Sequence, residues 1–599
     1  MSGSSPRGWA PALLGALAYA LLETAFFGER NLLLPWRPVH FTLIPVFFVL
    51  HAAVALGALG AAHVAVRWFR CPGAFVYFAP FGVLLGIHAL SHYRERVNLL
   101  PRDVSGTLIT LVLFAAPLVA AWVAARALRD RLPAARGIAL GVAFALVAIG
   151  CVRMATVKPV GTRSDVEPRL ESEVLEAVDT AQRVLVFGFD GASWVVVDKL
   201  IDEGRLPHLA TLANRGRAFD LETIRPTFSP VIWTSVATGK DRFDHGIHDV
   251  VQTRLPGGTL LPRSIMRTGF YTKTTGAPFR YLSARGAFPL IPYRSSQITA
   301  TSVFEAASEA GLSTSLVEWY VTWPTRSLSG IVVSDRFHLQ SPESPSTDTV
   351  SPGALAPILA SHIVLPNEEL DSGVLALIDT TGLSGAEADA WLEEHRLFRE
   401  EMRYNLARDL TTRNVAVDLL SRDQEWKLFG LYFRAVDLSH HLTWPYRNDA
   451  QGREPRLSPV IDRYHEVMDG IVGEVLALVP DDAIVILLSD HGYETGYGHA
   501  RAPDGFAIVA GGPTIPTAER GRISVYEIAP TVAALLGIPV AEDLAARPRL
   551  DLFGLGPEHT VRSVSTWQRG DYEGPSEDDV PDGVDQSEID RLRALGYIQ

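Results

Sequence analysis

Residues 484–492 read Ile-Val-Ile-Leu-Leu-Ser-Asp-His-Gly, a continuous apolar run that leads directly into an aspartate and a histidine. A short run of this kind, rich in β-branched residues, is typical of a strand that is buried on both faces. Comparable runs lie at 184–189, 331–333 and 428–433, and helical patterns separate them. The chain is therefore predicted to contain an α/β domain in which helices cover both faces of a mostly parallel sheet.

The apolar residues of the 599-residue chain are concentrated in its N-terminal part. Five apolar stretches there approach the ~20 residues that an α-helix needs to cross a membrane. A cleaved signal peptide fits less well, because the first stretch is followed by four more rather than by a mature soluble domain. We expect a transmembrane region of five helices within residues 1–155, at 9–27, 41–66, 74–92, 107–128 and 137–155.

The remainder of the chain divides into three parts by composition. We expect a polar linker at 156–182, the α/β domain at 183–547 and an acidic C-terminal tail at 548–599. Residues 250–300 and 338–420 interrupt the alternation of strands and helices, so they are candidate insertions that could cover a site. Lys and Arg residues are divided almost equally between the two sides of the predicted spans, so their count does not decide the membrane orientation.

The formal net charge of −13 and the two cysteines narrow the range of partners and ligands. An acidic chain offers no basic surface to a phosphate backbone, so we expect no nucleic-acid partner. Cys71 and Cys151 both lie in the apolar N-terminal part. A metal site in the α/β domain must therefore use histidines and carboxylates.

Polar residues follow two of the predicted strands at their carboxyl ends, where open α/β sheets bind ligands. Asp190 comes after the run at 184–189, although an Asp-Gly pair is often only part of a turn. Asp490 and His491 come after the second run, and His499 follows a glycine-rich turn. A strand that delivers an Asp-His pair at its end is uncommon unless the pair holds a ligand.

Another segment carries a candidate nucleophile. Ser229 precedes Pro230, and proline is favoured at the first position of a helix. The start of a helix attracts anionic groups, so a serine hydroxyl there suits an attack on an anionic ester. Ser229 could also be only a helix N-cap.

A fourth segment follows the apolar run at 428–433. Asp437 and His441 offer a carboxylate and an imidazole four positions apart, a pairing that suits zinc. His440 is the competing candidate, because only one of the two neighbouring histidines need face a metal ion.

Taken in this order, the four segments resemble the alkaline phosphatase superfamily, most closely its type I phosphodiesterase and nucleotide pyrophosphatase branch. The resemblance covers residues 183–547 and includes the stretch 527–537, which resembles the closing helix of that family. It implies an alkaline-phosphatase-like fold with two divalent metal ions. Histidines and aspartates without thiolates suit zinc best, with manganese or iron as alternatives. The implied ligands are Asp190, Asp490 and His491 for one ion, with Ser229 as its bridging catalytic nucleophile, and Asp437, His441 and His499 for the other.

The resemblance also implies an activity. It predicts a metal-dependent phosphoric ester hydrolase, a phosphodiesterase that acts through a phosphoseryl intermediate. With the apolar N-terminal region, it predicts an integral protein of a bacterial inner membrane whose catalytic domain lies on the outer, periplasmic or extracellular face. The expected partners are the lipid bilayer and a phosphate ester, with lipid-linked and glycan-linked esters both open.

Several alternatives stay open on the sequence alone. The chain could be a transferase that moves phosphoethanolamine or phosphoglycerol onto an envelope polymer, or an inactive membrane scaffold. Thr227 is a second candidate for the nucleophile. A nucleotide substrate is not favoured, because residues 230–233 lack the asparagine that nucleotide-cleaving members place after the nucleophile. A sulfatase is disfavoured, because neither cysteine nor Ser229 lies in a Cys/Ser-x-Pro-x-Arg motif.

Overall fold

The computed structural model describes residues 174–225, 227–254, 260–262, 289–423, 425–447, 452–493, 502–556 and 560–568, and the single positions 49, 52 and 589. Apart from these single positions, the five predicted spans and the tail beyond residue 568 lie outside the described residues. The linker up to residue 173 does so as well. Among the residues that are described, no helix is both long enough and apolar enough to cross a membrane.

The chain divides into two compact units, Met1–Gly161 with Val251–Ile291 and Thr162–Val250 with Pro292–Gln599. Three short strands, which belong to the first unit except for the last residue of β5, form a sheet in the order β4-β3-β5, with β3 and β4 antiparallel. Their bounds are Val251–Arg254 for β3, Leu260–Pro262 for β4 and Leu290–Pro292 for β5.

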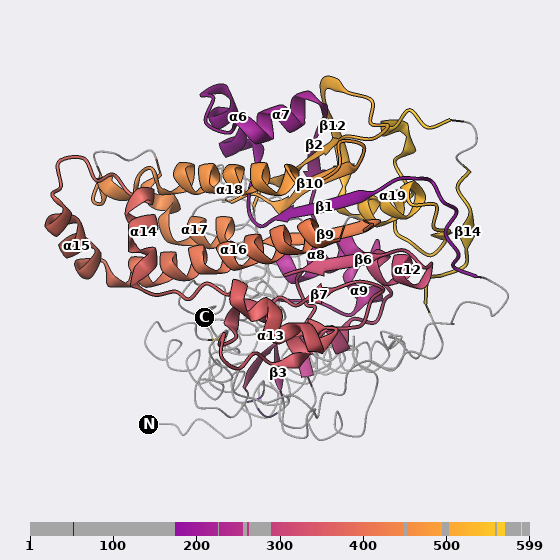
Figure 1. Ribbon diagram of the computed structural model, residues 1–599, viewed down its shortest axis with the longest axis horizontal. Coiled ribbons are helices and arrows are strands. Elements are labelled where there is room, and N and C mark those ends of the chain that lie inside the picture. The colour runs from indigo at the N-terminus through magenta and orange to yellow at the C-terminus, as the bar shows by residue number, and fades with distance from the viewer. Residues whose placement is uncertain are drawn as a thin grey trace, which may run out of the picture. The chain divides into compact units, whose positions relative to one another are not determined.

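The second unit is built on a nine-stranded sheet with the order β12-β2-β11-β10-β1-β9-β6-β7-β8 (Figure 1). The central strand β1 pairs in parallel with β10 and β9, so that Val184 lies opposite Ile484 on one side and Leu428 on the other. Within this sheet, only β11 and β8 are antiparallel to the other strands. The predicted, mostly parallel sheet is therefore confirmed. Its strands are β1 (Val184–Phe189), β2 (Gly216–Glu222), β6 (Thr314–Val317), β7 (Val332–Val333), β8 (Val350–Ser351), β9 (Leu428–Phe433), β10 (Ile484–His491), β11 (Asp504–Ala510) and β12 (Thr517–Ser524).

Side chains of the central strands alternate between two apolar cores, one on each face of the sheet. In β1, Leu185, Phe187 and Phe189 belong to one core, and Val184 and Val186 belong to the other. Burying a side chain of this size contributes roughly 1.5–3 kcal/mol relative to leaving it exposed. Both faces of the sheet therefore have to be covered.

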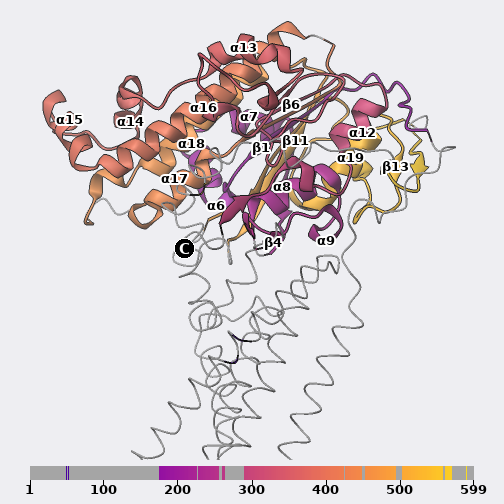
Figure 2. The same ribbon diagram turned by 90° about the horizontal axis from the view of Figure 1, so that it is seen from below.

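Helices cover the two faces (Figure 2). One face packs against α6 (Trp194–Asp202), α7 (Pro207–Asn214), α13 (Ala356–Leu359), α14 (Asp371–Leu377), α16 (Arg396–Arg422), α17 (Ala435–Thr443) and α18 (Val460–Leu476). The other face packs against α8 (Ser229–Thr238), α12 (Val303–Glu309) and α19 (Ile528–Leu535). The stretch 338–420 contains α13 and α14 and all but the last two residues of α16, so this stretch supplies part of the core.

The remaining elements of the second unit are short. They include the helices α9 (Arg242–His245) and α15 (Gly385–Glu394) and a parallel pair of strands, β13 (Val540–Ala541) and β14 (Ser563–Val564). Single 3-10 turns lie at Ser295–Gln297, Phe337–Leu339, Thr347–Thr349, Gly353–Leu355, Ala360–His362, Glu368–Leu370, Trp444–Tyr446, Pro455–Leu457, Val525–Glu527 and Leu550–Leu552.

Candidate metal centre and nucleophile

Four of the predicted ligands come together at the carboxyl ends of the central strands. Asp190 directly follows β1, and Asp490 and His491 are the last two residues of β10. Asp437 lies in the first turn of α17, the helix that follows β9. Because β10, β1 and β9 are adjacent and parallel, these residues meet at one edge of the sheet. All four are fully buried.

Gly191 allows the end of β1 to approach α17 closely. Its φ of +76° lies in the left-handed region, which favours glycine. A Cβ at this position would lie 2.5 Å from Cβ of Asp437 and 2.7 Å from Oδ1 of the same residue. The glycine after Asp190 is therefore required by the close approach of Asp437, and it is more than part of a turn.

Ser229 is the first residue of α8, and its hydroxyl reaches the buried carboxylates. Phe228 holds the N-cap position without a side-chain cap, so Ser229 is inside the helix and does not act as its N-cap. The Oγ atom donates a hydrogen bond of 3.1 Å to Oδ1 of Asp190 and lies 3.2 Å from Nε2 of His491. The hydroxyl thus lies beside two of the predicted metal ligands.

Three of the buried side chains could hold one metal ion. One ligand atom each of Asp190, Asp437 and His491 lies within 4.8 Å of the others. Nε2 of His491 is 3.4 Å from Oδ1 of Asp190 and 3.4 Å from Oδ2 of Asp490. The family resemblance assigns Asp190 and His491 to one ion and Asp437 to the other. The residues implied for the two ions are therefore neighbours at this edge of the sheet.

The electrostatics of these carboxylates favour a bound cation. Burial, followed by the charge of Asp437, raises the pKa of Asp190, although His491, Tyr432 and Arg434 act in the opposite direction. Burial and the charges of Asp190 and Asp437 raise the pKa of Asp490 well above its ordinary value. A divalent cation bound among these carboxylates would offset both the repulsion between them and their loss of hydration. The residues present therefore fit a divalent metal ion.

The two neighbouring histidines of α17 have different surroundings. Nε2 of His441 lies 3.3 Å from Oδ2 of Asp437, one helical turn earlier. The ring of His440 instead stacks on His465 with 5.5 Å between ring centroids, and burial followed by the charge of His465 holds the pKa of His440 well below its usual range. His441 is therefore the better placed of the two to bind a metal ion. His499 lies outside the described residues.

Two residues of the site carry no motif and were not predicted from the sequence. The Tyr432 hydroxyl of β9 donates a hydrogen bond to Oδ2 of Asp190. Arg434 follows the same strand, is 5% exposed, and lies with its guanidinium carbon 4.8 Å from the ring centroid of Tyr320. The only sequence signal for either residue is a polar group at the end of an otherwise apolar strand.

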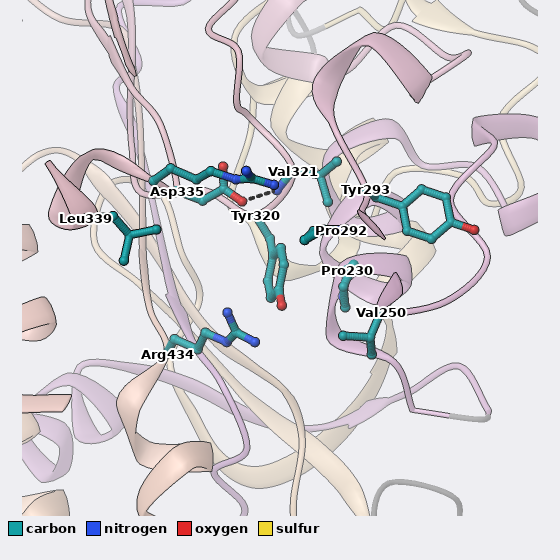
Figure 3. Close-up of a pocket in the computed structure, with 10 residues that line it drawn as sticks. Pro230, Val250, Pro292, Tyr293, Tyr320, Val321, Asp335, Leu339 and Arg434 are labelled. Carbon is teal, nitrogen blue, oxygen red and sulfur yellow. Dashed lines mark hydrogen bonds between the residues drawn. The ribbon is translucent and has the colours of Figure 1, made fainter. Parts of the chain in front are cut away.

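A pocket lies next to this site (Figure 3). Pro230, the neighbour of Ser229 in α8, forms part of its wall. Arg434 and Tyr320 also line it, so the pocket carries a positive charge beside the candidate nucleophile. The other lining residues are Val250, Pro292, Tyr293, Val321, Asp335, Arg336 and Leu339.

Residues 184–529 match the model of the family described as type I phosphodiesterase / nucleotide pyrophosphatase. The chain belongs to this family. The match runs from the start of β1 into α19 and includes every site residue predicted from the sequence. It confirms the branch that the four segments resemble. As a member of the type I phosphodiesterase family, the chain is a phosphoesterase with a phosphate ester as substrate, and it has a candidate buried metal site.

The type I phosphodiesterase chain also aligns with solved structures of low sequence identity. A variant of the alkaline phosphatase PafA is 11% identical, with a TM-score of 0.36 over 62% of this chain and 99% of that one. Murine ectonucleotide pyrophosphatase / phosphodiesterase 5 is 12% identical, with a TM-score of 0.33 over 62% and 100%. A candidate sulfatase from Bacteroides thetaiotaomicron is 11% identical, with a TM-score of 0.36 over 63% and 75%. No curated protein matches the chain in sequence.

Proposed function

We propose that the chain is a metal-dependent phosphodiesterase in which Ser229 attacks the phosphorus of the ester. The observation that carries this proposal is the position of the Ser229 hydroxyl, 3.1 Å from Asp190 and 3.2 Å from His491. A nucleophile and the residues of a cation site are thus in direct contact at the ligand-binding edge of the sheet.

Asp190, Asp490 and His491 would hold one divalent metal ion, and a carboxylate oxygen of Asp437 lies within 4.8 Å of the ligand atoms of Asp190 and His491. When bound, such an ion supplies positive charge that lowers the pKa of a nearby hydroxyl and neutralises the phosphoryl group. A set of imidazoles and carboxylates without thiolates suits zinc best, with manganese or iron as alternatives. The second ion of the proposal would use Asp437, His441 and His499.

The chain's own residues orient the nucleophile. The Tyr432 hydroxyl holds one oxygen of Asp190, so the other oxygen of this carboxylate stays directed at Ser229. Ser229 is also the first residue of α8, a helix of ten residues, and the positive end of the helix dipole favours an anionic phosphoryl group there.

In the proposed reaction, a bond forms between Ser229 Oγ and phosphorus while the bond from phosphorus to the leaving alcohol breaks. The hydroxyl proton passes to solvent, and the leaving oxygen takes a proton from water. A water molecule then attacks the phosphoseryl intermediate, Oγ leaves, and Ser229 regains a proton. The net reaction consumes one water and yields an alcohol and a phosphate monoester.

The proposal includes the location of the domain. Residues 1–155 would anchor the catalytic domain at 183–547, through the linker at 156–182, to a bacterial inner membrane, with the domain on the outer face. The described part of the predicted tail at 548–599 packs with the domain, because it contains β14, which pairs with β13, and the buried Trp567. The five apolar stretches support the anchor. A lipid-linked or glycan-linked phosphodiester would then be the substrate within reach.

The test uses the full chain, purified in detergent without chelator and assayed on a panel of phosphate monoesters and diesters. Ser229→Ala should abolish turnover and leave the metal content unchanged. Thr227→Ala and Ser235→Ala, two buried hydroxyl residues of the same segment, should retain turnover. Diester turnover that survives in Ser229→Ala would contradict the nucleophile assignment. With labelled phospholipid, a free head group indicates hydrolysis, and label on an envelope glycan would indicate a transferase instead.

A further inference from the structure

Arg434 occupies a position that links the pocket to the candidate metal centre. Arg434 directly follows β9 and precedes Asp437 by three residues. The same strand end therefore positions both the guanidinium and a candidate metal ligand. The residue is 5% exposed and lines the pocket together with Pro230, the neighbour of Ser229. A buried arginine in a ligand pocket beside a nucleophile is well placed to meet an anionic substrate.

The ring of Tyr320 lies against this guanidinium. The guanidinium carbon lies 4.8 Å from the centroid of the Tyr320 ring, within the range of a cation–π contact. The ring of Tyr320 in turn lies 5.7 Å from that of Tyr432, the residue that donates to Asp190. In Figure 3, Arg434 approaches the ring of Tyr320, and Pro230 and Val250 lie on the other side of this ring.

Next to Ser229 the pocket wall offers few donors for phosphoryl oxygens, and the guanidinium carbon of the other lining arginine, Arg336, lies 3.9 Å from the ring centroid of Trp323. Residues 230–233 are Pro-Val-Ile-Trp, so no amide side chain follows the nucleophile. Pro230 also lacks a backbone N–H, and Val250 is apolar. Asp335, which also lines the pocket, accepts hydrogen bonds from the backbone N–H groups of Val321, Thr322 and Trp323.

We propose that Arg434 is the substrate-binding residue of this site and that its guanidinium donates two hydrogen bonds to the non-bridging oxygens of the ester phosphate. The planar group matches two phosphoryl oxygens, whereas an ammonium group would act as a single point charge. Tyr320 is the positioning residue, because its ring holds the guanidinium plane. This inference rests on the proposed phosphodiesterase function and names the group that replaces the missing amide side chain.

The test measures the binding of inorganic phosphate to the metal-loaded full chain by titration calorimetry. Arg434→Met, which keeps an unbranched side chain but removes the guanidinium, should weaken phosphate binding at least ~10-fold, since hydrogen bonds to charged groups are lost. Arg434→Lys should give an intermediate loss. The kcat/KM for the best diester should fall by roughly 10²–10³ in Arg434→Met, as when an oxyanion donor is removed. Added guanidinium should restore part of the activity of Arg434→Ala.

Arg447→Met is the matched control. Arg447 is a mostly buried arginine whose guanidinium carbon lies 5.4 Å from the ring centroid of Trp444, and it pairs with Asp462 at 3.2 Å. It is not among the pocket-lining residues. Its loss should lower the melting temperature but leave phosphate binding unchanged.

The outcomes separate the two proposals. Arg434→Met that binds phosphate as tightly as the wild type would overturn the inference, whether or not the chain cleaves diesters. If Arg434→Met does not fold, Arg434→Lys carries the same comparison, and phosphate binding equal to the wild type overturns the inference. A wild-type chain that binds phosphate through Arg434 but cleaves no ester would instead contradict the proposed function and leave the inference standing.

Discussion

The hydroxyl of Tyr432 in β9 donates a hydrogen bond to Oδ2 of Asp190, which follows the neighbouring strand β1. The other oxygen of the same carboxylate accepts a hydrogen bond from Ser229. The strand pairing places Tyr432 opposite Gly188, two residues before Asp190, so this contact is a direct result of the sheet register. The orientation of the candidate nucleophile therefore depends on a tyrosine that belongs to the sheet.

Tyr432→Phe should weaken metal binding by ~10–100-fold, the range found when a residue that orients a metal ligand is lost. The substitution removes the hydrogen bond but keeps the ring, which packs 4.7 Å from Trp233. The measurement is a competition titration of zinc or manganese against a chelator. Tyr464→Phe is the control, because this buried tyrosine donates at 3.0 Å to Asp409, which is not among the candidate ligands. Equal metal affinity in wild type and Tyr432→Phe would contradict the positioning role.

The strands at the site could be predicted from the sequence because they are buried on both faces. The apolar runs at 184–189 and 428–433 coincide with β1 and β9. The apolar run at 484–488 is shorter than β10, which continues through Asp490 to His491. His491 is still paired, opposite Asp504 of the antiparallel strand β11, and this pairing leaves no local signal in residues 484–492.

The contacts between site residues were only partly predictable. Motif residues such as Asp190 and Asp437 were found because a carboxylate at the end of a buried strand or near a histidine is unusual. Tyr432 and Arg434 carry no such signal, since a tyrosine in a strand and an arginine after it are common and need no ligand. Their roles depend on which strands are neighbours, and this information lies in the pairing of distant segments.

Gly191→Ala should destabilise the domain more than Gly204→Ala, although both glycines have positive φ, +76° and +72°. An alanine in this conformation costs roughly 1–2 kcal/mol at either position. At Gly191 the new Cβ would also lie 2.5 Å from Cβ of Asp437, whereas at Gly204 nothing lies within 4 Å. Thermal unfolding of the full chain measures the difference, and metal titration should show reduced affinity only for Gly191→Ala. Similar losses of melting temperature in both variants would mean that Asp437 can move away at little cost.

His441→Ala should lower the amount of metal bound, and His440→Phe should leave it unchanged. Nε2 of His441 lies 3.3 Å from Asp437, while the ring of His440 stacks on His465 and is kept neutral by burial. Phenylalanine preserves the stacked ring of His440, so a loss of metal from that variant could not be attributed to lost packing. Elemental analysis of the purified variants gives the metal content. A loss of metal from His440→Phe but not from His441→Ala would reverse the assignment.

Glu318 predicts a pH dependence of stability that does not involve the metal centre. Burial raises the pKa of this fully buried carboxyl from 4.5 to about 7, even though Arg408 lies at 3.3 Å and His338 at 3.0 Å. The folded state therefore holds this proton at pH values where the unfolded chain has already released it. By linkage, the contribution of Glu318 to stability is fully present below about pH 4.5 and is lost as the pH rises through about 7.

Glu318→Gln removes this titration. The melting temperature of the metal-free wild type should fall relative to that of Glu318→Gln as the pH increases from 5 to 8. Asp409, whose pKa burial likewise raises to about 7, contributes to the pH dependence of both proteins; because the charge of Glu318 also raises the pKa of Asp409, the difference between them reports Glu318 together with this interaction. Glu394→Gln, an exposed position of α15, should follow the wild type at every pH. Parallel melting curves for wild type and Glu318→Gln across this range would show that Arg408 and His338 keep the buried carboxylate charged.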